Sequence, residues 1–389
     1  MNTGASAAAL RGHTVHVVSR LTPSVFNFLY LATQSIGATG APQTVIAIDD
    51  AFGKANLGEL RSDITVVAVP DHASPWARSR ALYQHLVDVS RRTRIAAMHL
   101  HGISPGLAGA RLVRQLDDRA MQVFMSPSSS RALTARSLLQ PLLLGLVRLQ
   151  MQSRQQPAAN LDLDAMLMKS LASLPVRVVE SAAADVFFRT PHHEARRPLV
   201  ISGGGHESVL ATARFIQLAV LLGDDSLALS FNWIGPAQTR TENAFRAAGI
   251  GHFRTASAGE RAQRLSTAWL WVAPHEERGF PIELVEAMAC GLPCVAYDCE
   301  SHRDVLGDSG AGFLCTSQDE MMQRVAELVD SPELRTRMGE AARTAATARF
   351  SERVFARRLL QAYNVLPGVV PESPPPPPDI AFPIERTPS

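Results

Sequence analysis

The chain has 389 residues, 46% of them hydrophobic and 19% charged, with a formal net charge of +2. That length is sufficient for two domains that each bury a core, and the near-neutral charge gives no electrostatic reason to expect a nucleic-acid-binding protein. The N-terminus lacks a basic region followed by an apolar run, and no stretch reaches about 18 consecutive apolar residues. We therefore expect neither a secretory signal nor a membrane-spanning helix, and a cytoplasmic location.

Apolar runs typical of strands alternate with helical stretches through the first half of the chain. The expected strands are residues 14–18, 44–48, 64–69, 96–100, 122–125 and 176–179. The expected helices are residues 26–38, 75–92 and 105–116. Such alternation predicts a parallel sheet that is covered by helices on both faces.

The same alternation starts again near Arg197 and predicts a second domain. The expected strands there are residues 199–201, 229–234 and 269–273, with another that starts at Cys294. The expected helices are residues 207–222, 241–248, 259–268, 318–329, 332–348 and 351–363. Two doubly wound domains that face a central cleft are the simplest architecture, and ligands in such sheets bind beyond the carboxyl ends of the strands.

Residues 269–298 form the most informative segment, with the order strand, loop, helix, glycine stop and strand. Pro281 suits the first turn of the helix, and Gly291 suits the left-handed residue after its end. The turn at Gly279 and Phe280 would leave backbone amides at the helix N-terminus, as phosphate binding requires. Glu286 follows about 8 Å along the axis, at about 1.5 Å per residue, which is near the reach needed to hold a sugar diol beside the phosphate.

Residues 279–296 resemble the donor-binding signature of the nucleotide-sugar glycosyltransferases of family 4 (group 1). Residues 16–25, 99–109 and 179–188 are weaker matches to the same family. The resemblance implies an α/β GT-B fold with two doubly wound, parallel-sheet (Rossmann-like) domains. It places an acceptor-side domain at residues 1–195, a nucleotide-sugar-binding domain at 196–350, a C-terminal helix that crosses back to the first domain at 351–365, and a Pro-rich disordered tail at 366–389.

The resemblance also implies a function: transfer of a sugar from a nucleotide diphosphate donor to a glycan or lipid-linked acceptor, in polysaccharide or glycoconjugate synthesis. Family precedent is retention of anomeric configuration without a metal ion, and with no cofactor beyond the donor itself. A lipid-linked acceptor would add peripheral contact with the inner face of a membrane. The apolar stretch at residues 138–151 carries little basic charge, which favours a core or interface helix over a membrane-surface helix.

By this resemblance Glu286 would bind the ribose hydroxyls, and the amides of Gly279 and Phe280 would face the diphosphate. The glycines after the expected strand 199–201 allow close backbone approach to an anion, or simply form a tight turn; they are Gly203, Gly204 and Gly205. His101, at the carboxyl end of a strand, is a catalytic candidate, although a lone histidine there is also a common structural residue.

The chain departs from the family at several donor-site positions. Arg278 stands where the family has its first glutamate, and Glu277 would contact the sugar only if the loop shifts by one residue. The other departures are Phe26 and Asn27 in place of paired glycines, Ser126 in place of a histidine, and the lack of an Arg and a Lys after strand 199–201. Arg278 is either a replacement for the missing positive charge or a solvent-facing loop residue.

These departures leave two alternatives to a working transferase. One is a non-catalytic relative that serves as a binding or scaffolding subunit. The other is a sugar-nucleotide epimerase of the same fold, against which the long match over residues 279–296 argues. The four cysteines, at positions 290, 294, 299 and 315, lack zinc-site spacing and predict buried thiols.

Overall fold

The computed structural model describes residues 12–49, 56–60, 62–72, 74–116, 122–126, 156–159, 177–204, 209–223, 228–254, 257–276 and 280–363. The chain divides into two compact units. Unit 1 comprises residues 1–181 and 355–375, and unit 2 comprises residues 182–354 and 376–389. The expected apolar helix at 138–151 and the Pro-rich tail lie outside the described residues.

Unit 1 is built on a parallel sheet whose described strands have the order β3-β2-β1-β4-β5-β6-β7. The strands are β1 (His13–Val18), β2 (Gln43–Asp49), β3 (Thr65–Pro70), β4 (Ile95–His101), β5 (Gln122–Ser126), β6 (Gln156–Ala159) and β7 (Arg177–Val178). The helices are α1 (Pro23–Gly37), a short 3₁₀ turn η1 (Leu57–Glu59), α3 (Pro75–Arg92) and α4 (Ile103–Leu116). Helix α16 (Glu352–Ala362) begins in unit 2, and its residues from Phe355 onward belong to unit 1.

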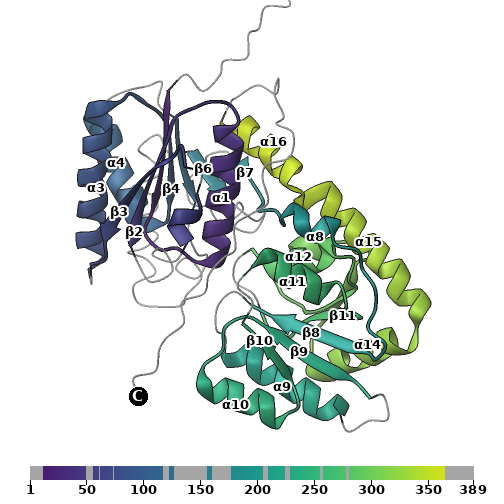
Figure 1. The fold of residues 1–389 in the computed structure, drawn as a ribbon. Coiled ribbons are helices and arrows are strands. Elements are labelled where there is room, and N and C mark those ends of the chain that lie inside the picture. The colour runs from purple at the N-terminus through teal and green to yellow at the C-terminus, as the bar shows by residue number, and fades with distance from the viewer. Residues whose placement is uncertain are drawn as a thin grey trace, which may run out of the picture. The chain divides into compact units, whose positions relative to one another are not determined.

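The two faces of this sheet have different chemistry because successive side chains of a strand point to opposite sides. One face packs against α3 and α4 and is apolar; its core includes Val15, Val17, Leu82, Leu86, Met98, Leu100 and Leu112. The opposite face carries the alternate residues of β1 and β4, and α1 and α16 lie on that side (Figure 1). Those alternate residues include three buried histidines: His16, His99 and His101.

Unit 2 is built on a second parallel sheet, with the order β10-β9-β8-β11-β12-β13 among its described strands. The strands are β8 (Leu199–Gly203), β9 (Ser230–Ile234), β10 (Gly251–Phe253), β11 (Leu270–Ala273), β12 (Cys294–Tyr297) and β13 (Gly312–Cys315). The helices are α8 (Asp185–Arg189), α9 (Val209–Gly223), α10 (Thr239–Ala247), α11 (Ala258–Leu265), α12 (Ile282–Ala289), α13 (Glu300–Leu306), α14 (Gln318–Asp330) and α15 (Pro332–Phe350). The chain winds outward in one direction from β8 and in the other from β11, which makes their junction the topological switch point.

Helix α12 ends at a close contact with α15. Gly291 has φ +81°, the left-handed conformation predicted for the residue after this helix. A Cβ on Gly339 of α15 would lie 2.3 Å from the carbonyl oxygen of Gly291, so only glycine fits at residue 339 without movement. The signature helix is therefore held firmly against the long C-terminal helix of its own unit.

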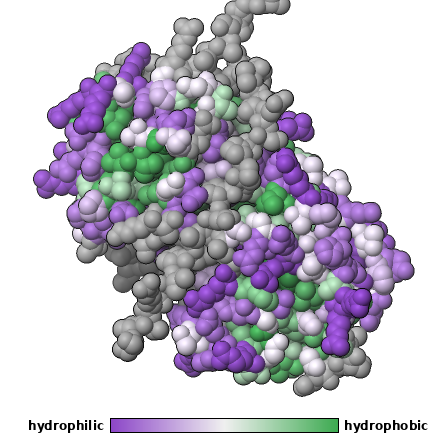
Figure 2. Space-filling view, viewed as in Figure 1, coloured by the Kyte–Doolittle hydropathy of each residue, from purple (hydrophilic) through white to green (hydrophobic). Residues whose placement is uncertain are grey.

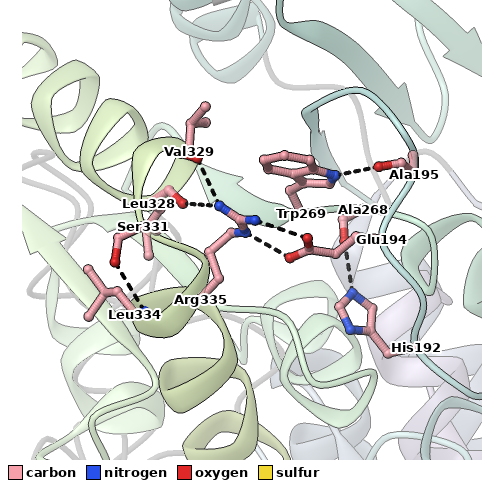
Figure 3. A network of polar contacts seen from close by, with 10 residues as sticks. All are labelled: His192, Glu194, Ala195, Ala268, Trp269, Leu328, Val329, Ser331, Leu334 and Arg335. Atoms are coloured by element: carbon pink, nitrogen blue, oxygen red, sulfur yellow. Dashed lines mark hydrogen bonds and ion pairs between the residues drawn. The ribbon is translucent and has the colours of Figure 1, made fainter.

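Arg335 of α15 is the centre of a buried polar network in unit 2 (Figure 3). Its side chain is 3% exposed and makes two hydrogen bonds to the carboxylate of Glu194, at 2.7 and 3.0 Å. It also donates to the carbonyl oxygens of Leu328 and Val329, at 2.7 and 2.8 Å. The guanidinium carbon lies 3.9 Å from the ring centroid of Trp269. One side chain thus closes the C-terminus of α14 and joins it to the segment that leads into β8.

Helix α9 is apolar on its outer side as well as on its core side. Its exposed apolar residues are Val209, Leu210, Val220 and Leu221. Figure 2 shows hydrophobic residues among hydrophilic ones on the visible surface. The helix has only 15 residues. Within the described ranges, no helix combines the length and apolarity needed to cross a membrane.

The predicted alternation of strands and helices is confirmed, with element ends within about three residues of those expected. The two parallel sheets confirm the α/β fold class. The elements that the sequence did not predict are short: β6, β10, β13, α8 and α13. Strand β13 is an example: it has only four residues. It starts at Gly312, where a Cβ would lie 2.4 Å from the carbonyl oxygen of Cys294, so its first residue is fixed by close packing and not by strand propensity. A run this short gives too little periodicity to recognise.

Candidate functional site

The candidate site of unit 2 lies at the carboxyl ends of β8 and β11, which are paired neighbours in the sheet. At a switch point the connections from two adjacent strands leave in opposite directions, so a crevice opens beyond the strand ends. The segments that follow these two strands are the glycine-rich turn at 203–205 and the signature loop at 274–279. Both segments selected from the sequence therefore start at the same edge of one sheet.

The glycine turn allows a very close approach between β8 and β9. A Cβ on Gly203 would lie 2.1 Å from the carbonyl oxygen of Ile234, and the amide of Gly204 donates to that same oxygen at 3.1 Å. Gly235 has φ +132°, and a Cβ there would lie 2.2 Å from the carbonyl oxygen of Gly204. The packing of β8 against β9 therefore requires a residue without a side chain at position 203. Any role in phosphate binding remains a prediction.

The signature helix α12 starts one residue later than the pattern suggested, because Pro281 is its N-cap and Ile282 its first residue. Phe280 is buried, and its ring packs edge-on against Phe350, with centroids 5.8 Å apart. This packing fixes the entry of the chain into the helix. It leaves the first turn as the anion-attracting end that phosphate binding would use.

Glu286 of α12 is buried and paired with Arg261 of α11. Arg261 donates from Nη2 to Oε1 at 2.7 Å and from Nε to Oε2 at 3.1 Å. The two side chains are 12% and 8% exposed, so this is a bidentate pair in a largely water-free place. The guanidinium carbon also lies 5.6 Å from the ring centroid of Phe187. The pair fixes the rotamer of Glu286.

A second arginine lies beside the signature loop. Arg214 of α9 donates from Nη1 to the carbonyl oxygen of Pro274 at 3.3 Å. Its guanidinium carbon lies 4.6 Å from the ring centroid of Tyr297, the last residue of β12. Arg214 is therefore a positive charge at the carboxyl ends of β11 and β12. It lies on the helix that follows β8, the strand after which the sequence lacks the family's Arg and Lys.

The segment after β12 holds one thiol that differs from the others. Burial raises the pKa of Cys299, but hydrogen bonds and charge from His302, with a hydrogen bond from Ser301, outweigh burial and lower the pKa to about 7. Burial raises the pKa of Cys290, Cys294 and Cys315. Those three are buried as the sequence predicted, and Cys299 is half-buried.

In unit 1 the sequence candidates occupy interior or helical positions. His101 is the last residue of β4, is 4% exposed, and lies in a stack with His16 and His99. Phe26 is buried within α1, and the side-chain amide of Asn27 donates to Ser181 at 3.1 Å. Ser126 ends β5, in register with His101. The burial of His101 favours its interpretation as an interior residue of unit 1.

Four of the sequence candidates lie outside the described residues: Gly205, Glu277, Arg278 and Gly279. Their roles remain predictions. Arg261 and Arg214 were the residues that sequence reasoning did not assign to the site. Neither belongs to a motif, and both reach the site because α11 and α9 pack beside the strands that carry it.

Residues 237–345 match the family model of the glycosyl transferases group 1. This segment of the chain is therefore similar to that family. The match covers α10 through most of α15 and includes both Arg261 and Glu286. The resemblance that the signature suggested is therefore confirmed over this segment, while the glycine turn after β8 and Arg214 lie before it.

Relatives and solved structures agree with this assignment. The chain is 31% identical over 108 residues to N-acetyl-alpha-D-glucosaminyl L-malate synthase of Bacillus anthracis, which covers 27% of this chain and 28% of that one. It is 22% identical over 191 residues to N,N'-diacetylbacillosaminyl-diphospho-undecaprenol alpha-1,3-N-acetylgalactosaminyltransferase of Campylobacter jejuni, covering 48% and 49%. The match thus spans at most about half the length of these relatives. The structure resembles HepE of Anabaena in complex with UDP, with a TM-score of 0.72 at 13% identity over 91% of this chain and 100% of that one, which confirms the GT-B fold.

Proposed function

We propose that the chain transfers a sugar from a nucleotide diphosphate donor to a hydroxyl group of a glycan or lipid-linked acceptor, with retention of anomeric configuration and without a metal ion. The observation that carries the proposal is Glu286, a buried carboxylate fixed by Arg261 on the signature helix of a group 1 segment. The names of the relatives, a synthase that forms a glucosaminyl malate and a transferase that acts on an undecaprenol-linked sugar, support this class of reaction.

In this proposal Glu286 accepts hydrogen bonds from the two ribose hydroxyls of the donor. An ionised carboxylate has about four acceptor sites. Arg261 uses two of them, so about two remain for a diol. Because Arg261 fixes the carboxylate plane, the nucleotide does not have to order the side chain when it binds.

The diphosphate would lie at the N-terminus of α12, where the amides of Gly279 and Phe280 and the helix dipole favour negative charge. Arg214, which donates to the carbonyl oxygen of Pro274 at the start of the loop, would neutralise a phosphate there. Arg278 is the other candidate cation in the loop. These groups would stabilise the charge that develops on the leaving diphosphate as the bond to the anomeric carbon breaks, which is the task that a metal ion performs in other transferases.

The acceptor hydroxyl then forms the new bond to the anomeric carbon as the bond to the diphosphate breaks, and its proton passes to the departing nucleoside diphosphate. Glu277 would contact the sugar from the signature loop. A lipid-linked acceptor would bring the chain to a membrane surface by peripheral contact. Co-flotation with vesicles that carry an undecaprenol diphosphate sugar, compared with vesicles that lack it, would detect such contact.

The direct test is a thermal-shift series with UDP, GDP, ADP and their sugars. A ligand bound only by the folded state stabilises it by about 2.7 kcal/mol at a hundredfold excess over the dissociation constant. We expect a shift with one nucleotide, its loss in Glu286→Gln, and its retention in Glu340→Gln, an exposed glutamate of α15. Release of that nucleoside diphosphate from its sugar donor would then show turnover. Binding without turnover on any acceptor would favour the scaffolding alternative, and no shift with any nucleotide would contradict the proposal.

A further inference from the structure

Three histidines lie together on one face of the sheet in unit 1. His16 of β1 and His99 of β4 are direct register partners, and His101 follows His99 by two residues on the same face. They are 0%, 2% and 4% exposed. The two strands belong to the centre of the sheet, so the cluster is enclosed in the interior of the unit.

The three rings are stacked closely. The ring centroids of His99 and His101 are 4.2 Å apart, and His16 lies 5.9 Å from each. One nitrogen from each ring can be chosen so that all three atoms lie within 4.8 Å of one another. Both ring nitrogens of His16 and Nε2 of His101 are buried and make no hydrogen bond within the described protein. A buried polar atom without a partner is rare, and a group of such atoms on neighbouring rings requires an explanation.

We propose that His16, His99 and His101 bind one divalent transition-metal ion, with Zn²⁺ as the best match, in the interior of unit 1. Three imidazole nitrogens are a donor set that suits zinc, copper, nickel and cobalt. Three histidines with a fourth, non-protein ligand form one of the recurrent zinc sites in proteins. The hard cations Mg²⁺ and Ca²⁺ prefer oxygen ligands, which this cluster does not provide.

The protonation state of the rings agrees with metal binding. Burial lowers the pKa of His16 to about 4. Burial also lowers the pKa of His99 and His101, and the charge of the neighbouring histidines adds to it. All three rings are therefore neutral near pH 7 and have a lone pair available, so no proton has to be displaced when the metal binds.

The surroundings supply the outer contacts of a metal site. Nδ1 of His99 lies 2.7 Å from the phenol oxygen of Tyr363, a contact that would hold the ring's other nitrogen toward the cluster. Phe28 packs edge-on against both His99 and His101, and Phe355 packs on Phe28. This aromatic shell keeps the cluster dry, which strengthens coordination by neutral ligands.

Binding requires a modest rearrangement. With Zn–N distances of about 2.0–2.1 Å, tetrahedral coordination brings nitrogens to about 3.4 Å from one another, so a pair separated by as much as 4.8 Å must close by about 1.4 Å. The rings of His99 and His101 are nearly parallel, at 6°, and must tilt for their lone pairs to converge. Rotation about the side-chain bonds would have to accomplish both. The ion would join β1 to β4. Through the contact between His99 and Tyr363, the residue after α16, it would also link these strands to the end of that helix. Its role is therefore structural and separate from the transfer step.

The test uses the full chain, stripped with a chelator and titrated with Co²⁺ and Zn²⁺. We expect one Co²⁺ per chain with the visible absorption of a tetrahedral site, displacement of that signal by Zn²⁺, and a higher melting temperature with either ion. His16→Leu and His101→Leu should lose the signal and the stabilisation. His85→Leu, which removes a half-buried histidine of α3 outside the cluster, should keep both.

Tyr363→Phe separates a metal site from a merely buried cluster, because it leaves all three ligands in place. We expect it to weaken Co²⁺ binding by about 10–100-fold, the usual effect of removing an outer contact to a ligand histidine. The proposal is overturned if the wild-type chain shows no tetrahedral cobalt signal and no stabilisation, a result that does not depend on whether any variant folds. It is also overturned if His85→Leu, and not the cluster variants, removes the binding.

Discussion

Arg261 holds both carboxylate oxygens of Glu286, with Nη2–Oε1 at 2.7 Å and Nε–Oε2 at 3.1 Å. The two residues belong to neighbouring helices, α11 and α12, and both side chains are almost fully enclosed. A buried carboxylate without a partner would be strongly destabilising. The pair therefore makes a charged residue tolerable inside unit 2 and at the same time fixes the direction in which its remaining lone pairs point.

We predict that Arg261→Ala lowers nucleotide affinity about tenfold, or about 1.4 kcal/mol, because Glu286 loses the partner that fixes its orientation. The variant should also lower the free energy of unfolding by about 3 kcal/mol, as expected when one partner of a buried pair is removed. Arg261→Lys should recover only part of the affinity, since an ammonium group cannot make the bidentate contact. Calorimetric titration of the nucleotide found in the thermal-shift series, together with urea unfolding, gives both numbers.

The matched control is Arg264→Ala, one turn further along the same helix. Arg264 pairs with Glu260 at 2.9 Å, but the side chains are 32% and 41% exposed. Exposed pairs contribute about 0–1 kcal/mol, so this variant should change stability little and leave affinity unaltered. Equal effects of the two substitutions would show that the Arg261 pair has no special part in nucleotide binding.

Arg335→Ala should destabilise unit 2 by about 3 kcal/mol, the lower end of the range for breaking a buried ion pair, because Glu194 is one-third exposed and regains some hydration. The loss also leaves the carbonyl oxygens of Leu328 and Val329 without this donor. Tryptophan fluorescence during urea unfolding is a suitable probe, since Trp233, Trp269 and Trp271 all belong to unit 2.

Arg337→Ala is the control for that experiment, because Arg337 is an exposed residue of the same helix. It should shift stability by no more than about 0.5 kcal/mol. If both variants unfold at the same urea concentration, the network of Figure 3 does not stabilise the unit.

The sequence predicted the layered fold because strand and helix periodicities act over a few residues, and Gly291 and Pro281 mark the ends of α12 by their own backbone preferences. It predicted Glu286 through the surrounding motif. It could not predict Arg261, because the pairing depends on how α11 packs against α12, 25 residues apart along the chain. The sequence predicts only part of the histidine cluster. Residues 99 and 101 share a face in any strand, but the strand register that brings His16 beside them is set only in the folded sheet.

Cys299 should be the reactive thiol of this chain. With a pKa of about 7, it is about half ionised at neutral pH, while the buried thiols with raised pKa values remain protonated. Alkylation by iodoacetamide, followed by mass spectrometry of the folded protein, should show Cys299 modified first, with a rate that is half-maximal near pH 7. His302→Gln should move that midpoint upward. A midpoint near the ordinary thiol pKa in the wild-type chain would rule out the influence of His302.

Glu352 gives unit 2 a pH-dependent stability. Burial raises its pKa to about 7, assisted by the nearby charge of Asp185 and opposed by the amide of Asp185 and by Arg189. The backbone amide of Asp185 donates to Oε1 of Glu352 at 2.9 Å. The other carboxylate oxygen of Glu352, Oε2, is buried and makes no hydrogen bond in the described protein. The protonated form is therefore favoured in the folded state.

Because the folded pKa lies above the unfolded value, the native state binds more protons between about pH 4.3 and pH 7. This contribution is complete below about pH 4.3 and is lost as the pH rises through about 7, a total of about 4 kcal/mol at about 1.4 kcal/mol per pKa unit. Glu352→Gln should remove the slope and make the chain more stable than wild type at pH 8. Urea unfolding at pH 5, 6, 7 and 8, followed by tryptophan fluorescence, measures the difference between the two proteins. A constant difference across the series would mean that Glu352 is ionised in the folded state at every pH tested, because a carboxylate that does not change its proton number on unfolding cannot produce a pH-dependent difference.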